Sequence, residues 1–68
     1  MIEKLTKRLK PARKRAGLTL HQAGERAGVS HVFWCQVESG KKIPNAARLE
    51  SMGKAVGLRL RMSFERVR

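Results

Sequence analysis

The stretch TLHQAGERAGVSHVFWCQVESG, residues 19–40, decides the fold that this chain is expected to adopt. It predicts two short helices joined by a turn of about three residues. Thr19 can cap the first helix, and Gln22 three positions later completes a capping box. Gly28 can end that helix, because glycine adopts the left-handed conformation without steric cost. Ser30 offers a second cap, so the spacing is that of a helix-turn-helix motif.

Inside the motif, glycine and the aromatic residues indicate how the helices pack. Gly24 lowers helix stability by roughly 1 kcal/mol relative to alanine. Close packing against the second helix would explain it, and we favour this over a weakly selected surface position. In the second helix, Trp34 and Val37 are expected in the core and Phe33 at a partly exposed junction. Stacking of these aromatic rings on bases is the less favoured alternative.

Helices are also expected on both sides of the motif. Before it, apolar residues recur at the spacing of one helix face, at Ile2, Leu5, Leu9, Ala12 and Ala16. Pro11 lacks the N–H that an interior helix bond needs. Either the main helix starts one to three residues before Pro11, or a longer helix is kinked there, and we favour the kink. After the motif, Asn45 is expected to cap a helix that runs to about Val56.

The end of the chain has a different pattern. Apolar residues alternate with polar ones over eight residues, which is typical of a half-buried strand; they are Leu58, Leu60, Met62 and Phe64. A lone strand in a helical chain needs a partner for its backbone groups. The same strand of a second copy, antiparallel across a two-fold axis, supplies one. We therefore expect a dimerisation strand at about 58–65; a final helix broken by Gly57 is the alternative.

Length and cysteine content limit the class of protein. The 68 residues form a single domain, 1–68, with a small core, so a subunit partner is the expected extra source of stability. Cys35, the one cysteine, cannot form an intrachain disulfide and fits a reduced cytoplasmic setting. No stretch has the pattern of a signal peptide or a membrane-spanning helix. We expect a cytoplasmic protein.

The net charge of +11, from 16 Lys and Arg against 5 Asp and Glu, indicates a polyanionic partner. Double-stranded DNA is the first expectation, because a membrane-surface helix would need a bulky apolar face with aromatic anchors, which is absent. Four residues of the second motif helix are expected to contact bases, through hydrogen bonds and the methyl groups of valine: His31, Val32, Cys35 and Gln36. Lys41 and Lys42 would then lie beside the phosphate backbone.

Chemistry other than binding has little support in the sequence. His31 and Cys35, four residues apart, could provide half of a metal site, but no further ligands are apparent, so neither a metal nor a cofactor is expected. No paired carboxylates, glycine-rich phosphate loop or nucleophile–base arrangement is present. We expect that the protein is not an enzyme.

From Leu9 onward the chain resembles the Cro/phage-repressor (XRE-type) helix-turn-helix family. The similarity is carried by Arg13 and Pro44 and by the segments GLT (17–19), ERAGVS (25–30), ESGK (38–41) and LESMGKAVGL (49–58). It implies a mainly α fold, a lambda-repressor-like bundle of four helices. Many members have a fifth helix where this chain has LRLRMSFE, for which we expect the C-terminal β-strand that pairs across a dimer. The resemblance also implies a structural ion pair between Arg13 and Glu38.

The resemblance assigns roles to residues of the motif. Base contacts in the family fall at positions matching His31, Val32 and Gln36, and sometimes Cys35. The phosphate contacts expected here are Thr19, His21, Ser30, Ser39, Lys41 and Lys42. Where many members carry a phosphate-binding glutamine, this chain has Leu20, and His21 or the general basic charge is expected to compensate.

A strand at the C-terminus resembles the HipB-like antitoxin branch of this family. Those antitoxins repress their own operon and bind a kinase-fold toxin. The leading hypothesis is therefore a homodimeric repressor of its own operon that binds a palindromic operator. The alternative is an antitoxin that acts mainly by binding a kinase-fold toxin.

Overall fold

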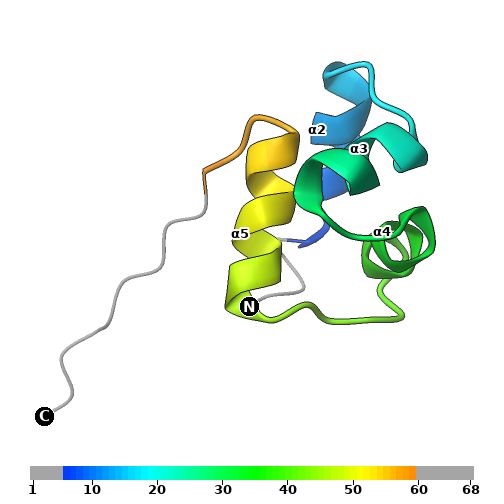
Figure 1. The fold of residues 1–68 in the computed structure, drawn as a ribbon, viewed down its shortest axis with the longest axis vertical. Helices are drawn as coiled ribbons and strands as arrows, with labels where there is room; N and C mark the ends of the chain where they lie inside the picture. The colour runs from blue at the N-terminus through cyan, green and yellow to red at the C-terminus, as the bar shows by residue number, and fades with distance from the viewer. Residues whose placement is uncertain (1–5, 60–68) are drawn as a thin grey trace, which may run out of the picture.

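A computed structural model describes residues 6–59 of the chain. Its helices are α2 (Leu9–Arg15), α3 (Leu20–Ala27), α4 (His31–Glu38) and α5 (Ala46–Ala55). Figure 1 shows α3 in the middle of the bundle, between α2, α4 and α5. None of the residues 6–59 is in a strand. Leu58 and Arg59 have no regular secondary structure, and residues 60–65 of the expected strand lie outside the described residues, so that strand stays a prediction.

The first helix of the described region begins just before its proline. α2 starts at Leu9, two residues before Pro11, and the preceding Lys7 and Arg8 form a turn. Pro11 therefore lies in the first helical turn, where a backbone N–H has no intrahelical partner to lose. Thr6 is helical, so the break in the described chain lies at Lys7 and Arg8 rather than at Pro11. The alternative, a helix that starts one to three residues before Pro11, describes α2, and the part of the favoured longer helix at residues 1–5 lies outside the described residues.

The ends of the two motif helices follow the sequence pattern. Thr19 Oγ1 accepts a hydrogen bond from the N–H of Gln22 at 3.1 Å, and Gln22 Oε1 accepts one from the N–H of Thr19 at 2.9 Å. This confirms the capping box at the start of α3. Gly28 ends α3 in the left-handed region, with φ of 73°. Ser30 Oγ then accepts a hydrogen bond from the N–H of Phe33 at 3.0 Å and starts α4.

The last described helix is also capped as expected. Asn45 Oδ1 accepts a hydrogen bond from the N–H of Arg48 at 2.8 Å, and α5 follows from Ala46. Val56 caps its C-terminal end. The expected boundaries of this helix are confirmed to within a residue.

The core lies where the faces of the helices meet. Trp34 and Val37 are buried, which confirms the expected inward face of α4. They pack in one cluster with apolar residues of the other helices: Leu9, Ala12, Ala23, Leu49, Met52, Ala55 and Val56. Phe33 is partly buried against this cluster, and the guanidinium carbon of Arg48 lies 5.2 Å from the centre of its ring. The expected position of Phe33 at a partly exposed junction is confirmed.

Gly24 lies against the turn that joins the motif helices. A Cβ atom at this position would lie 2.6 Å from the carbonyl oxygen of Val29 and 3.2 Å from the backbone nitrogen of His31. The expected close packing is confirmed, although the contact is with the turn and the first residue of α4. A glycine is therefore required because any side chain at this position would collide with the backbone of the turn.

Among residues 6–59, no helix combines the length and the apolar character needed to cross a membrane.

Candidate nucleic-acid interface

The orientation of α4 determines which of its side chains face the solvent. Because Trp34 and Val37 are buried, the opposite side of the helix is directed outward. This side carries the residues expected to contact bases. His31 and Cys35 are exposed, Val32 is 52 % exposed, and Gln36 is partly buried. The structure thus brings these four residues together on one face, which we call the α4 outer face.

The α4 outer face carries hydrogen-bonding groups but no lysine, arginine or acidic residue. The Gln36 amide can donate and accept hydrogen bonds, and the His31 imidazole can do both through its two nitrogens. Val32 offers methyl groups. A face of this kind fits the edges of base pairs, which present donors, acceptors and the thymine methyl in the major groove.

Glu38, the one acid of α4, is directed away from this face into an internal network. Arg13 Nε donates to Glu38 Oε2 at 2.7 Å, and Arg13 Nη2 donates to Oε1 at 3.2 Å. The indole Nε1 of Trp34 also donates to Glu38 Oε2, at 2.6 Å. Arg13 Nη1 donates in addition to the carbonyl oxygen of Leu18 at 2.9 Å.

This network attaches α4 to α2. The side chains of Arg13 and Glu38 are only 11 % and 7 % exposed, so the paired charges are shielded from water. The two-point geometry restricts orientation as well as distance. The residues expected to form a structural ion pair therefore do lie together. The carboxylate that would repel a phosphate is neutralised inside the protein.

Lysines follow the C-terminal end of α4. Lys41 and Lys42 are exposed, and their backbone N–H groups both donate to the carbonyl oxygen of Gln36, at 2.8 and 3.2 Å. Ser39 Oγ donates to the same oxygen at 3.1 Å. This arrangement holds the backbone of Lys41 and Lys42 against the last turn of α4, next to Gln36 of the α4 outer face. Ser39 uses its hydroxyl within this turn.

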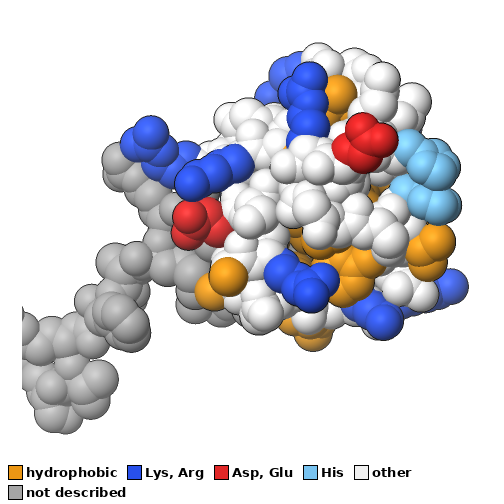
Figure 2. Space-filling model, viewed as in Figure 1, with side chains coloured by type: hydrophobic (Ala, Val, Ile, Leu, Met, Phe, Trp, Pro, Cys, Tyr) orange, Lys and Arg blue, Asp and Glu red, His pale blue; other side chains and the backbone are white. Residues whose placement is uncertain are grey.

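The caps Thr19 and Ser30, both expected to contact phosphates, lie at the N-termini of α3 and α4. Between these ends the structure shows a contact that the sequence analysis missed. The rings of His21 and His31 are stacked, with their centroids 3.7 Å apart and their planes inclined by 26°. Figure 2 shows the two histidines side by side at the edge of the molecule. Residues ten positions apart have no common helical periodicity, so only the crossing of α3 and α4 brings them together.

The residues expected at a dimer contact are only partly described. Leu58 is half-buried and packs against the core of its own chain. Leu60, Met62 and Phe64 lie outside the described residues, and their role stays a prediction.

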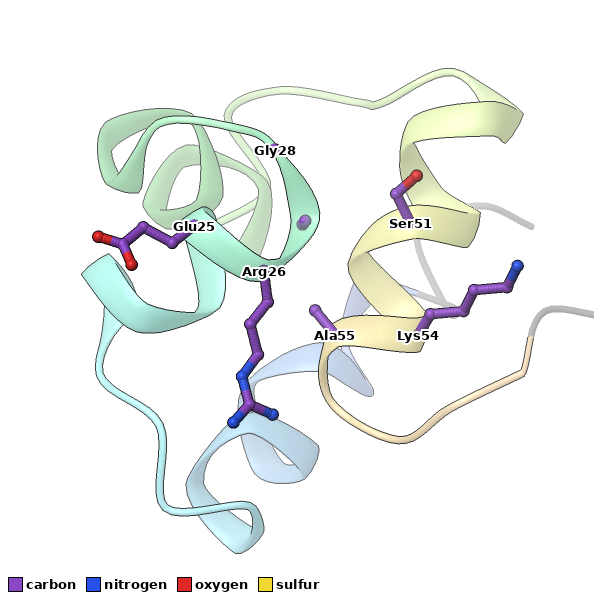
Figure 3. Close-up of a pocket in the computed structure, with 7 residues that line it drawn as sticks. Glu25, Arg26, Gly28, Ser51, Lys54 and Ala55 are labelled. Carbon is purple, nitrogen blue, oxygen red and sulfur yellow. The ribbon is translucent and has the colours of Figure 1, made fainter.

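A shallow hollow of about 530 Å³ lies away from the α4 outer face, along α3 and α5. In Figure 3 the charged side chains of Glu25, Arg26 and Lys54 point in different directions rather than toward a common centre. Ser51, also in its lining, donates its hydroxyl to the carbonyl oxygen of Ala47. The hollow therefore offers no converging set of polar groups for a ligand. Within residues 6–59, no group of three or more His, Cys, Asp or Glu side chains could hold a metal ion.

Comparison with known families agrees with this geometry. The family model described as a helix-turn-helix domain, which falls in the XRE/Cro-like group, matches residues 4–62 of this chain. No curated protein and no solved structure matches it. A helix-turn-helix domain with this arrangement indicates a DNA-binding regulator. The chain belongs to the helix-turn-helix domain family of the XRE/Cro-like group.

Proposed function

We propose that this protein is a homodimeric transcription repressor that binds a palindromic operator through the α4 outer face. The observation that carries the proposal is that α4 presents hydrogen-bonding side chains on its outer face and is followed closely by two lysines. Its outer face can form hydrogen bonds and carries no lysine, arginine or acidic residue, and the backbone of Lys41 and Lys42 is held at its C-terminal end. Groups for sequence-dependent contacts and cations for sequence-independent contacts are thus available on one helix and the loop that follows it, and DNA recognition uses both kinds.

The high positive charge supports the same function. Cations beside phosphates release counterions from DNA, which supplies affinity that depends on salt but not on sequence. The α4 outer face supplies the base contacts that discriminate between duplexes. Because Glu38 is paired with Arg13, no carboxylate of α4 opposes the approach of the phosphate backbone.

A dimer is proposed because a single α4 helix would contact only a few base pairs. Two copies related by a two-fold axis would place their α4 helices in successive major grooves, about 34–36 Å apart. The alternating pattern at residues 58–65 is the sequence observation for the pairing strand. Sedimentation of the full chain tests this proposal. The wild-type chain is expected to be a dimer, and Met62→Asp is expected to convert it to a monomer. A monomeric wild-type chain would contradict it.

Selection of bound fragments from random duplex DNA, at about 150 mM salt, tests the main proposal. The expected result is a palindromic consensus whose half-sites are about one helical turn apart. Binding without any enriched motif, with a uniform dependence on salt, would contradict sequence-specific repression.

Paired variants separate base contacts from phosphate contacts. Gln36→Ala is expected to relax sequence preference and to weaken binding to the consensus by about 1–3 kcal/mol. Lys42→Ala is expected to weaken all duplexes alike and to reduce the salt slope by about 1. Lys54→Ala is the matched control, since it removes the same charge from α5, where Figure 3 shows the side chain pointing away from α3. An equal loss on every sequence for Gln36→Ala would contradict its role in reading bases.

The antitoxin alternative rests on the alternating tail, which is similar to that of the HipB-like branch. It keeps the same DNA-binding face and adds a kinase-fold toxin as a second partner. Purification of the chain at its natural level of expression distinguishes the two. If the chain is an antitoxin, a kinase-fold protein is expected in the eluate in a stoichiometric amount. If the chain is a repressor alone, no such protein is expected there.

A further inference from the structure

We propose that His21 is a positioning residue for base reading: it stacks on His31 and fixes the plane in which the His31 ring meets DNA. This inference rests on the proposed function of α4. It gives His21 a role that acts through another side chain, in place of the direct phosphate contact expected from the sequence.

The geometry of the pair supports this role. With 3.7 Å between ring centroids and 26° between planes, one face of each imidazole covers a face of the other. The ring nitrogens lie in the ring plane, so stacking leaves them at the edge. Neither imidazole has a hydrogen-bond partner among the described residues. The nitrogens of His31 are therefore available for a base edge.

The backbone at both ends of the pair is fixed. His21 is the second residue of α3, directly after the capping box at Thr19, and His31 is the first residue of α4, directly after the cap Ser30. Gly24 lies one helical turn after His21 on the same face of α3. Because the backbone nitrogen of His31 approaches Gly24 so closely, His31 starts α4 against the face of α3 that carries His21.

Stacking restricts a side chain that would otherwise rotate. An exposed histidine at the start of a helix samples several rotamers, and binding to a base would have to select one. The His21 ring blocks one side of His31 and favours the orientation in which the two faces remain in contact. His31 is thus preorganised before DNA arrives. Other ionisable groups one helical turn from the pair are Glu25, four residues after His21, and Cys35, four residues after His31.

Four variants of the full chain test the proposal in the selection described above: His21→Phe, His21→Ala, His31→Ala and the double alanine variant. Phenylalanine keeps a flat ring that can stack but has no nitrogen to contact a phosphate. His21→Ala is expected to lose preference at the same base pair of each half-site as His31→Ala, by roughly 5- to 10-fold. His21→Phe is expected to retain that preference. The double variant is expected to bind the consensus no more weakly than His31→Ala, since the two residues act as one unit.

A direct phosphate contact would give a different pattern. His21→Ala and His21→Phe would then weaken every duplex to the same extent, and the loss would add to that of His31→Ala. That result overturns the positioning role while leaving the proposed function in place. A wild-type chain that selects no consensus would overturn both.

The free protein provides a readout that does not depend on DNA. The ring protons of His31 lie over the face of His21, so their NMR chemical shifts contain a ring-current contribution. His21→Ala is expected to remove this contribution and His21→Phe to retain one, while thermal unfolding shows that both variants remain folded. Unchanged His31 shifts in His21→Ala would overturn the proposed stack.

Discussion

Replacement of Gly24 by alanine is expected to destabilise the protein, although alanine is the better helix former. In an open helix, Gly→Ala would raise stability by about 1 kcal/mol. In α3, the new Cβ would lie 2.6 Å from the carbonyl oxygen of Val29, whereas ordinary van der Waals contact begins at 3.4 Å. The obstructing atom belongs to the backbone, so rotation of a side chain cannot relieve the collision.

The expected size of the effect follows from these opposing terms. Overpacking a tight site typically costs about 1–3 kcal/mol, and more where the backbone must shift. Because the obstructing atom belongs to the backbone, the upper part of this range applies, about 2–3 kcal/mol. After subtraction of the helix-propensity gain of about 1 kcal/mol, we expect Gly24→Ala to lower the free energy of unfolding by about 1–2 kcal/mol. For a domain of this size, that corresponds to a fall in Tm of roughly 5–15 °C. The turn to α4 would also move, so affinity for DNA is expected to fall with stability.

Thermal and urea unfolding followed by circular dichroism measure this effect. Gly53→Ala is the matched control, because it places a methyl group in the last turn of α5 at 3.2 Å from the carbonyl oxygen of Leu58, a much milder contact. It is expected to remain within about 1 kcal/mol of the wild type, since a small displacement offsets the helix-propensity gain. A Gly24→Ala variant as stable as the wild type or more stable would refute the close contact between α3 and the turn.

Two further substitutions test the internal contacts. Glu38→Gln is expected to lower the free energy of unfolding by about 3 kcal/mol, because it leaves the Arg13 charge shielded from water and unpaired. Urea unfolding measures this loss. Glu50→Gln, which removes an exposed ion pair with Lys54, is the control and is expected to cost under about 1 kcal/mol. Equal effects of the two would show that shielding of the Arg13 pair contributes nothing. Thr19→Ala is expected to lower stability by about 1 kcal/mol through loss of the α3 cap, whereas Ser51→Ala, on the exposed side of α5, is expected to leave Tm unchanged.

Much of the fold could be predicted because its determinants are local. The caps at Thr19, Ser30 and Asn45 act on backbone groups two or three residues away, so a short stretch of sequence contains both partners. The buried face of α4 follows from the spacing of Trp34 and Val37 along one helix. Pro11 shows the limit of this reasoning: the sequence allowed two paths for the chain, and the break lies at Lys7 and Arg8 rather than at Pro11, where we expected a kink.

The candidate interface was predictable in part for the same reason. Once the inner face of α4 was assigned, the helical period placed His31, Val32, Cys35 and Gln36 on the outer side. The pairing of Arg13 with Glu38 was implied by the family resemblance, since no local pattern connects residues 25 positions apart. The participation of the Trp34 indole in that network was not anticipated.

The sequence by itself determined the capped starts of α3, α4 and α5, which helix faces are apolar and that a polyanionic partner is expected, since these properties depend on neighbouring residues and on total charge. Only the tertiary structure decided the contacts between helices: the approach of Gly24 to the turn, the three-residue network at Glu38 and the stack of His21 on His31. The first and the last depend on the angle and distance at which α3 crosses α4, and the network depends on how α4 lies against α2. That geometry is set by the packing of all the core side chains together, so it cannot be obtained from the spacing of residues along one helix.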